Sequence, residues 1–159
     1  MLDERLRLRL ELDSFYADYT ATLDEGRWQD WPEFFLDDCL YRLMPRENYT
    51  QGLDLCIILC ESKGMLLDRV AAITDTSTYG PRALRNYISG LRVRSRSEGA
   101  VETESSFLQV ETMNDEPSRV FLSGRAYDRL VPTEGGWKLS ERLCVFDSNL
   151  VLNSLIVPV

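Results

Sequence analysis

Histidine is absent from this 159-residue sequence. The absence excludes nucleophiles that histidine activates, such as Ser–His and Cys–His pairs, and it removes the usual general base at neutral pH. Rieske clusters and facial-triad iron sites also need imidazole ligands. This chain alone can therefore build neither a histidine-dependent active site nor either kind of iron centre.

Positive charge is also in short supply, because 18 lysines and arginines stand against 26 aspartates and glutamates, a net charge of −8. Binding to phosphates or to anionic lipid needs a basic surface, so we expect no nucleic-acid partner and no membrane partner. Apolar runs such as Leu55–Cys60 are too short to span a bilayer, and the first residues lack the apolar core of a signal peptide. We therefore expect a cytoplasmic protein.

Cysteine is sparse, and its four positions are Cys39, Cys56, Cys60 and Cys144. All four lie in apolar contexts typical of strands, where a reduced cysteine packs as a small hydrophobic side chain. Cys56 and Cys60 would share one face of a strand, yet neither a CxxC motif nor a histidine supports a metal pair there. We expect buried free thiols.

Apolar and aromatic residues are plentiful, and their spacing predicts helices followed by a sheet. Leu8, Leu12, Tyr16 and Tyr19 recur at helical spacing, and Gly26 can end that helix in the left-handed conformation. We expect helices over 3–24, 29–36 and 61–75, strands over 39–46 and 53–60, and a polar turn over 47–52. No repeat or linker divides the sequence, so we expect residues 1–159 to form a single domain.

The second half alternates with period two, which predicts long strands joined by hairpin turns. These strands are expected over 85–97, 100–112, 119–131 and 137–152. In the third of them, Leu122, Ala126 and Asp128 share one face, opposite Arg125, and Gly124 is a plausible bend point. Helices followed by an antiparallel meander predict an α+β fold. N-terminal helices on one side of a strongly curved sheet form a cone, which resembles the nuclear-transport-factor-2-like fold.

Four segments, in this order and spacing, resemble the β (small) subunit of aromatic-ring-hydroxylating dioxygenases. They include LDEGRW at 23–28, ESKGMLLDRV at 61–70, RNYIS at 85–89, and SGRAYDRL at 123–130 followed by GWKLSERLCVFDS at 136–148. The segment Pro45–Asn48 and the tail 146–159 are most similar to the small subunits of salicylate 5-hydroxylase and terephthalate dioxygenase types. Many family members carry histidine where this chain has Asn86.

The resemblance implies a structural role. In this family the large α subunit carries the Rieske 2Fe-2S cluster and a mononuclear Fe(II), and the small subunits form a homotrimeric ring beneath it in an assembly of three α and three β subunits. Electrons come from NAD(P)H through a separate reductase or ferredoxin. The resemblance thus implies a non-catalytic small subunit, without a cofactor of its own, of an oxygenase that hydroxylates a salicylate-, benzoate- or terephthalate-like aromatic acid in aromatic degradation.

Charged side chains supply candidates for a subunit interface. The pair Asp68–Arg69, on an expected helix, either contributes little at the surface or anchors the helix to the sheet or to a neighbouring subunit. Arginines and carboxylates on the expected strands suit a polar interface better than a solvated face. These strand residues are Arg125, Asp128, Arg129, Glu141 and Arg142. The row Arg92, Arg94 and Arg96 is expected to form a basic stripe on one solvated face of the sheet.

The tail 148–159 has no charged side chain. Exposure of its apolar residues would forgo about 1.5–3 kcal/mol for each large side chain. The tail either completes the last strand and enters its own core, or crosses into a neighbouring subunit, with Pro158 at an edge position. We predict the crossing, which makes Leu155, Ile156 and Val157 interface residues.

A rival hypothesis places chemistry inside the cone. Other proteins of this fold are free-standing isomerases or dehydratases with a carboxylate base and a tyrosine donor, for which Asp38, Tyr16 and Tyr41 are the candidates here. A third hypothesis, a small-ligand-binding protein, needs an open apolar pocket, which the aromatic cluster at 28–35 could line. We favour the small-subunit interpretation because of the four family segments.

Overall fold

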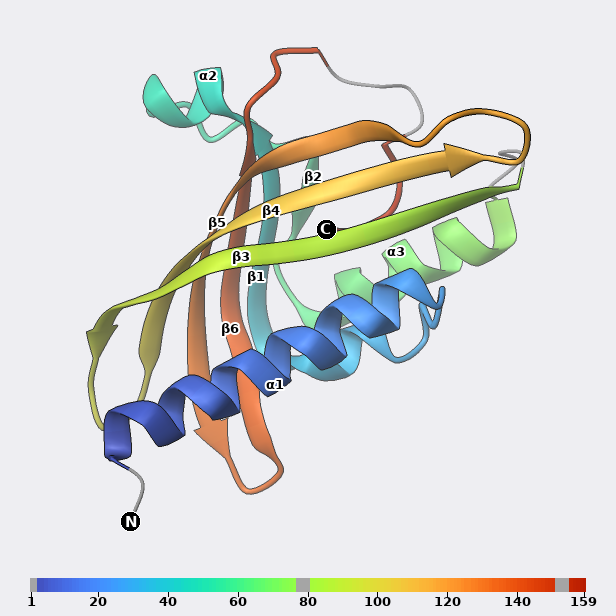
Figure 1. The fold of residues 1–159 in the computed structure, drawn as a ribbon. Coiled ribbons are helices and arrows are strands. Elements are labelled where there is room, and N and C mark those ends of the chain that lie inside the picture. The colour runs from blue at the N-terminus through green and yellow to red at the C-terminus, as the bar shows by residue number, and fades with distance from the viewer. Residues whose placement is uncertain (1–2, 77–80, 151–154) are drawn as a thin grey trace.

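The computed structural model describes residues 3–76, 81–150 and 155–159, and in it one six-stranded sheet curves over a long helix (Figure 1). The strand order is β2-β1-β6-β5-β4-β3. The predicted α+β arrangement of an N-terminal helix on a curved, mainly antiparallel sheet is confirmed. Along the chain the elements are α1 (Glu4–Asp24), η1 (Trp31–Phe34), β1 (Phe35–Pro45), α2 (Arg46–Thr50), β2 (Ile58–Cys60), α3 (Lys63–Thr76), β3 (Arg82–Arg96), β4 (Val101–Met113), β5 (Arg119–Thr133) and β6 (Gly136–Phe146).

The sheet is built around the predicted meander, in which β3, β4, β5 and β6 pair antiparallel in sequence order. β1 then adds in parallel to β6, and β2 pairs antiparallel with β1 at the edge. Gly124 of β5 lies opposite Phe146 of β6, where a Cβ would come within 2.0 Å of the carbonyl oxygen of Val145. Glycine is therefore required for the close approach of these two strands.

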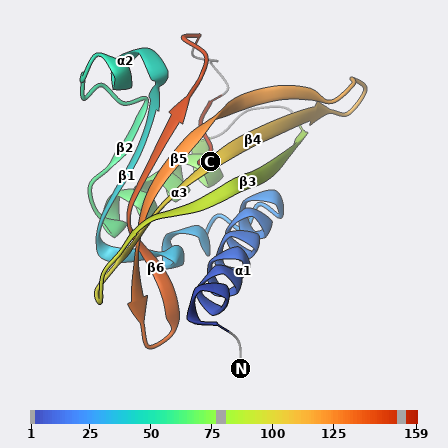
Figure 2. The same cartoon turned by 60° about the vertical axis from the view of Figure 1, so that its left-hand side comes forward.

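Helix α1 packs through the apolar stripe that its spacing predicts. Its N-cap is Asp3, whose side chain accepts a hydrogen bond from the Arg5 amide, and Gly26 follows its end with φ +65°. Leu12 and Tyr19 on the stripe are completely buried. Figure 2 shows α1 beneath the open side of the sheet, beside β3, so the sheet and helix enclose an interior.

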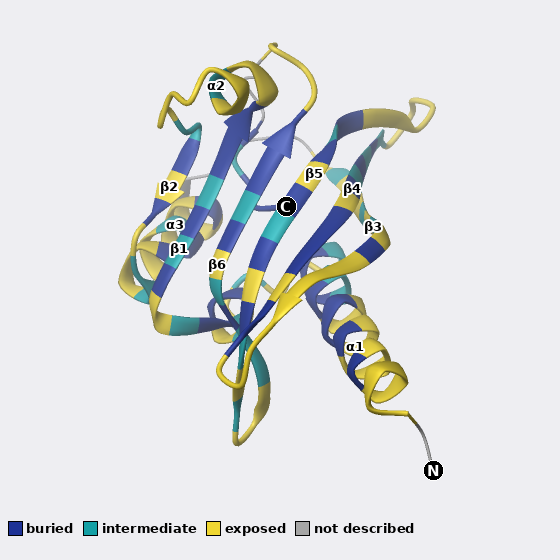
Figure 3. Ribbon diagram, turned by 90° about the vertical axis from the view of Figure 1, so that its left-hand side faces the viewer, coloured by how far each residue is buried: buried dark blue, intermediate teal, exposed yellow. Residues whose placement is uncertain are grey.

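Aromatic side chains fill one end of that interior. Trp31, Phe35 and Tyr41 are each 0% exposed, and their rings meet edge to face at centroid distances of 5.3 to 6.1 Å. Such pairs contribute about 0.5–1.5 kcal/mol beyond the apolar area that they bury. Along the strands, buried and exposed bands alternate, as Figure 3 shows. These aromatic residues belong to the core and do not line an open pocket.

Several predicted boundaries are wrong. The expected helix over 29–36 is only the short 3-10 helix η1, since Phe35 is already extended with φ −113° and ψ 153°. The expected turn over 47–52 contains the helix α2, the strand expected over 53–60 contracts to β2, and the last strand ends at Phe146. The helix expected over 29–36 was wrong because two buried residues lie four apart, one on the 3-10 turn and one on the following strand. A helix would give the same spacing of buried residues.

Within the described ranges, no helix is both long and apolar enough to cross a membrane.

Candidate functional site

The interior of the cone holds an ion pair whose two side chains are fully shielded from solvent. Asp128 of β5 and Arg142 of β6 are register partners, and Arg142 Nη1 donates to Asp128 Oδ2. From α1, the Tyr16 hydroxyl donates to the same oxygen at 2.7 Å and lies 2.8 Å from Thr103 Oγ1. Burial raises the pKa of Asp128, and the charge of Arg142 and the hydrogen bond from Tyr16 oppose part of that rise. The pair thus joins two strands and the helix.

The described end of the chain enters the same interior. The carbonyl oxygen of Val159 accepts hydrogen bonds from the Tyr19 hydroxyl at 2.9 Å and from Arg142 Nε at 3.2 Å. The amide of Val159 donates to the hydroxyl oxygen of Tyr41 at 3.0 Å. Residue Val159 therefore bridges α1, β1 and β6 from inside.

The prediction that Leu155–Val159 crosses into a neighbouring subunit is wrong. Leu155 and Val157 are only 7% and 5% exposed, and Ile156 is half-buried, all within the chain's own fold. The sheet and α1 leave an interior that needs apolar filling, and the segment supplies it while its backbone finds polar partners there. Residues 151–154 of the tail lie outside the described residues.

Among the described residues, this filling leaves no substrate-sized space on the interior side of the buried pair. The cavity bounded by Tyr19, Arg142 and Val159 has a volume of about 10 Å³. That is room for one water molecule, whereas ligand pockets measure roughly 300–1,000 Å³.

The structure does not bring together the residues of the isomerase or dehydratase hypothesis. Tyr16 and Tyr41 are buried, and burial raises the pKa of each well above its ordinary value. Asp38 is exposed on β1 and does not face the interior. The hypothesis therefore lacks its general base.

Sequence reasoning placed Asp128 and Arg142 at a subunit interface, and that placement is wrong because both side chains are 0% exposed. The sequence did contain a signal that Asp128 is buried. Asp128 alternates in phase with Leu122 and Ala126, which are buried, and out of phase with the exposed Arg125. A charged residue on the apolar face of a strand needs a buried counter-charge, and Arg142 on the neighbouring strand supplies it.

The other strand candidates do lie on the outer face of the sheet. Arg125, Arg129 and Glu141 are exposed there. Arg125 Nη1 lies 2.6 Å from Glu104 Oε1, and Arg129 Nη1 lies 4.0 Å from Glu102 Oε1. An interface role for these three candidates stays a prediction.

The remaining charged candidates are dispersed. Asp68 is exposed on α3, and Arg69 is half-buried beside Cys60, whose pKa is raised by burial and partly lowered by Arg69. Their interface role also stays a prediction.

The predicted basic stripe does not form. A register shift between Val93 and Ser95 breaks the alternation of β3. Arg94 consequently reaches Glu104 on the outer face, whereas Arg96 reaches Glu4 of α1.

Asn86, at the position where histidine is common in the resembling family, joins the sheet to the end of α1. Its backbone N–H and its Nδ2 donate to Asp24 Oδ1 at 2.8 and 2.9 Å. Its Oδ1 accepts a hydrogen bond from Gln109 Nε2 at 3.0 Å. The asparagine is thus a structural link in this chain.

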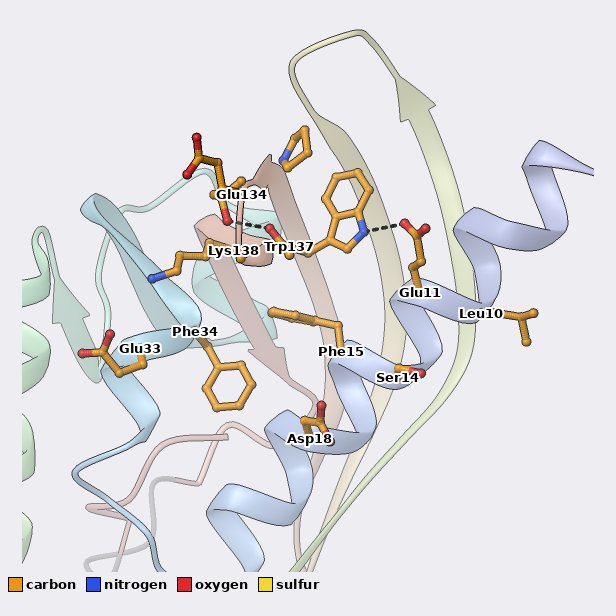
Figure 4. Close-up of a pocket in the computed structure, with 14 residues that line it drawn as sticks. Leu10, Glu11, Ser14, Phe15, Asp18, Glu33, Phe34, Glu134, Trp137 and Lys138 are labelled. Carbon is orange, nitrogen blue, oxygen red and sulfur yellow. Dashed lines mark hydrogen bonds between the residues drawn. The ribbon is translucent and has the colours of Figure 1, made fainter.

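A groove of about 800 Å³ opens on the outside of the cone, between α1 and the β5–β6 hairpin (Figure 4). Phe15 of α1 and Phe34 of η1 line its floor, and Trp137 lines the hairpin side. Trp137 Nε1 donates to Glu11 Oε2 at 3.1 Å, and this hydrogen bond, with a second from Arg7, lowers the pKa of Glu11. The groove is open to solvent and its rim is acidic.

A second buried carboxylate lies near the end of β4. Glu111 is 2% exposed, and its oxygens lie 2.7 Å from Arg82 Nη1 and 2.6 Å from Arg119 Nη2. Burial raises the pKa of Glu111, but the hydrogen bonds and charges of the two arginines outweigh burial and lower it from its ordinary value of 4.5.

The lowered pKa of Glu111 makes stability depend on pH. A carboxyl whose pKa is depressed in the folded state contributes stability above its unfolded pKa and loses it as pH falls through the folded value. We expect Glu111→Gln to lower the free energy of unfolding by about 1–3 kcal/mol at neutral pH. The loss should shrink as the pH falls below the ordinary glutamate pKa of 4.5 and through the lowered pKa of the folded state, where the wild-type carboxyl takes up its proton.

Urea denaturation at about pH 7 and about pH 3 measures this difference. Glu102→Gln is the matched control, because Glu102 is on the same strand and its side chain is 53% exposed. An equal loss for Glu111→Gln at both pH values would contradict the assignment.

Comparison with known proteins gives a consistent result. Residues 20–153 match the family described as "Ring hydroxylating beta subunit". The chain is 31% identical to the small subunit of anthranilate 1,2-dioxygenase from Burkholderia cepacia, over 99% of this chain and 98% of that protein. It is 28% identical to subunit beta 1 of the terminal oxygenase component of terephthalate 1,2-dioxygenase from Comamonas sp., over 94% and 97%.

A solved structure agrees with these relatives. A Novosphingobium aromaticivorans protein, assigned as the beta subunit of an aromatic-ring-hydroxylating dioxygenase, superimposes with a TM-score of 0.88 at 32% identity. The alignment covers 97% of each chain. The similarity therefore extends over nearly the whole fold.

Proposed function

This chain belongs to the ring-hydroxylating beta subunit family, and we propose that it is the non-catalytic small subunit of an oxygenase that hydroxylates an aromatic acid. The observation that carries the proposal is the family match together with full-length similarity to the small subunits of two dioxygenases. The resemblance found in the sequence motifs is confirmed by these comparisons.

The interior of the fold supports a structural role. The residues that could have formed a reaction chamber instead bind one another, with Tyr16 and Arg142 on Asp128 and with Tyr19 and Tyr41 on Val159. A cone whose interior is filled by residues 155–159 keeps a fixed shape, which suits a subunit on which another chain assembles.

The residues of this chain do not fit the iron centres of such an oxygenase. A Rieske cluster and a mononuclear non-haem iron both need histidine, and the sequence has none. We infer that a large α subunit carries the 2Fe-2S cluster and the Fe(II). In this proposal three large and three small subunits assemble in the cytoplasm, the small subunits form a ring, and a reductase or ferredoxin delivers electrons from NAD(P)H. The small subunit contributes one domain, residues 1–159, to that assembly.

An aromatic carboxylate is the proposed substrate class. The two relatives are named for anthranilate and terephthalate, which are both aromatic acids. Substrate contacts would lie in the large subunit, next to the iron.

Co-expression with a candidate large α subunit, one whose sequence carries the histidine ligands of both iron centres, tests the proposal. We expect a stable complex that contains both chains, shows the visible absorbance of a Rieske cluster, and hydroxylates an aromatic acid such as anthranilate, salicylate or terephthalate. The small subunit purified alone should be colourless, and light scattering should show it as a trimer.

Two results would overturn the proposed function. One is failure of the two purified chains to associate under any ionic strength. The other is full hydroxylase activity and normal assembly of the large subunit without the small one.

A further inference from the structure

The groove beside α1 combines an apolar floor with a charged rim. Its floor is aromatic, with Phe15 and Phe34, and its sides are formed by helix α1 and by the hairpin that carries Glu134 and Trp137 (Figure 4). A groove of this kind offers an apolar centre with a polar rim, which is the composition of a protein–protein contact.

The rim of the groove carries an excess of negative charge. Its carboxylates are Glu11, Asp18, Glu33 and Glu134, against the single lysine Lys138. Glu33 is paired with Lys63 at 3.0 Å, and Glu11 with Arg7 at 3.0 Å. Among the described residues, Asp18 and Glu134 form no ion pair. The two unpaired carboxylates lie on opposite walls, one on α1 and one on the hairpin.

The solvent side of α1 adds exposed apolar surface beside the groove. Leu6 and Leu10 are one helical turn apart and are 46% and 50% exposed. Leu10 lines the groove itself. These two side chains are not part of the core, because α1 packs on the interior through a different stripe, which includes Leu8 and Leu12.

Charge and shape together define the occupant. The acidic rim repels phosphates and acidic chains, and the groove is too open to enclose a small cation on several sides. An extended segment fits both features if lysine or arginine residues flank an apolar side chain, because the cations meet the rim while the apolar group covers Phe15 and Phe34.

We propose that this groove binds a basic, apolar-centred segment of the large subunit. The inference rests on the proposed function, since it identifies which surface of the small subunit the partner recognises. Electrostatic attraction orients the two chains during encounter, and the aromatic floor holds them once they are in contact.

Neutralisation of the rim tests the inference in the intact complex. We expect Asp18→Asn with Glu134→Gln to weaken the association of small and large subunits about tenfold or more, and to reduce its dependence on salt. The reversed pair Asp18→Lys with Glu134→Lys should weaken it further. Sedimentation or mass photometry over a range of ionic strengths measures these changes.

A matched pair of substitutions controls for net charge. Glu98→Gln with Asp115→Asn changes the total charge equally, and both residues are exposed in turns outside the groove. This control should assemble like the wild type. If the groove variant also assembles like the wild type, the groove is not the docking site while the proposed function stands. If even wild-type chains do not associate, the proposed function itself fails.

Cross-linking locates the segment directly. A zero-length carbodiimide reagent joins a carboxylate to a lysine amine that touches it. In the wild-type complex we expect Asp18 or Glu134 joined to a lysine of the large subunit, identified by mass spectrometry of the peptides. Links from these carboxylates only to another small subunit would overturn the inference and assign the groove to contact between copies of this chain.

Discussion

Replacement of Arg142 by methionine is expected to lower the free energy of unfolding by about 3–5 kcal/mol, or to prevent folding. Methionine replaces much of the apolar stem but leaves the Asp128 carboxylate buried without its counter-ion. The substitution also removes the donor to the carbonyl of Val159 and the guanidinium that lies 4.7 Å from the centroid of the Tyr19 ring. Urea denaturation followed by circular dichroism measures the loss.

Two further variants separate the buried charge from a general effect of losing arginine. Arg125→Met makes the same chemical change on the outer face, where the side chain is 59% exposed, and should cost less than about 1 kcal/mol. Addition of Asp128→Leu to Arg142→Met removes the uncompensated carboxylate and should restore a large part of the stability. Equal losses for Arg142→Met and Arg125→Met would show that the buried pair does not hold the cone together.

The sequence predicted most of the fold because its strongest periodicities are local. The stripe of α1 and the alternation along β3 to β6 each reflect one buried face, and a buried face imposes its period on the residues that form it. The short elements were harder to predict from the sequence. β2 has only three residues, and η1 joins β1 without a break, so neither repeats its pattern often enough to be distinguished from a neighbour.

The candidate site was predicted less well, because its parts meet only through the tertiary fold. The apolar tail had two acceptable locations from composition alone, and only the enclosed shape of the cone decides in favour of its own interior. The rival hypothesis needed Asp38 to face inward from a predicted helix-to-strand turn, whereas β1 begins at Phe35 and its alternation points that carboxylate outwards.

The acidic groove was beyond sequence reasoning for the same reason. Its walls come from α1, η1 and the β5–β6 hairpin, and more than a hundred residues separate Glu11 from the Trp137 that binds it. Taken one at a time in the sequence, each of these carboxylates is indistinguishable from an ordinary solvent-exposed acidic residue. Only their common location beside three aromatic rings distinguishes them.

Gly124 is the position where the smallest change should have one of the largest effects. An alanine there would place its Cβ 2.0 Å from the Val145 carbonyl oxygen and 2.7 Å from the Phe146 Cα. Both contacts are with backbone of the neighbouring strand, so no side chain can rotate away. The strands β5 and β6 would have to separate at the centre of the sheet, on the same two strands that carry the Asp128–Arg142 pair four residues away.

We therefore expect Gly124→Ala to lower the free energy of unfolding by at least about 3 kcal/mol, more than most overpacking substitutions. Thermal and urea denaturation measure the loss, and amide exchange should show faster opening of β5 and β6 than in the wild type. Gly99→Ala is the control, because a Cβ at Gly99 meets no atom within 4 Å and should change stability by less than about 0.5 kcal/mol. If Gly124→Ala proves as stable as Gly99→Ala, the two strands are farther apart than the structure places them, and the closure of the cone must be held by other contacts.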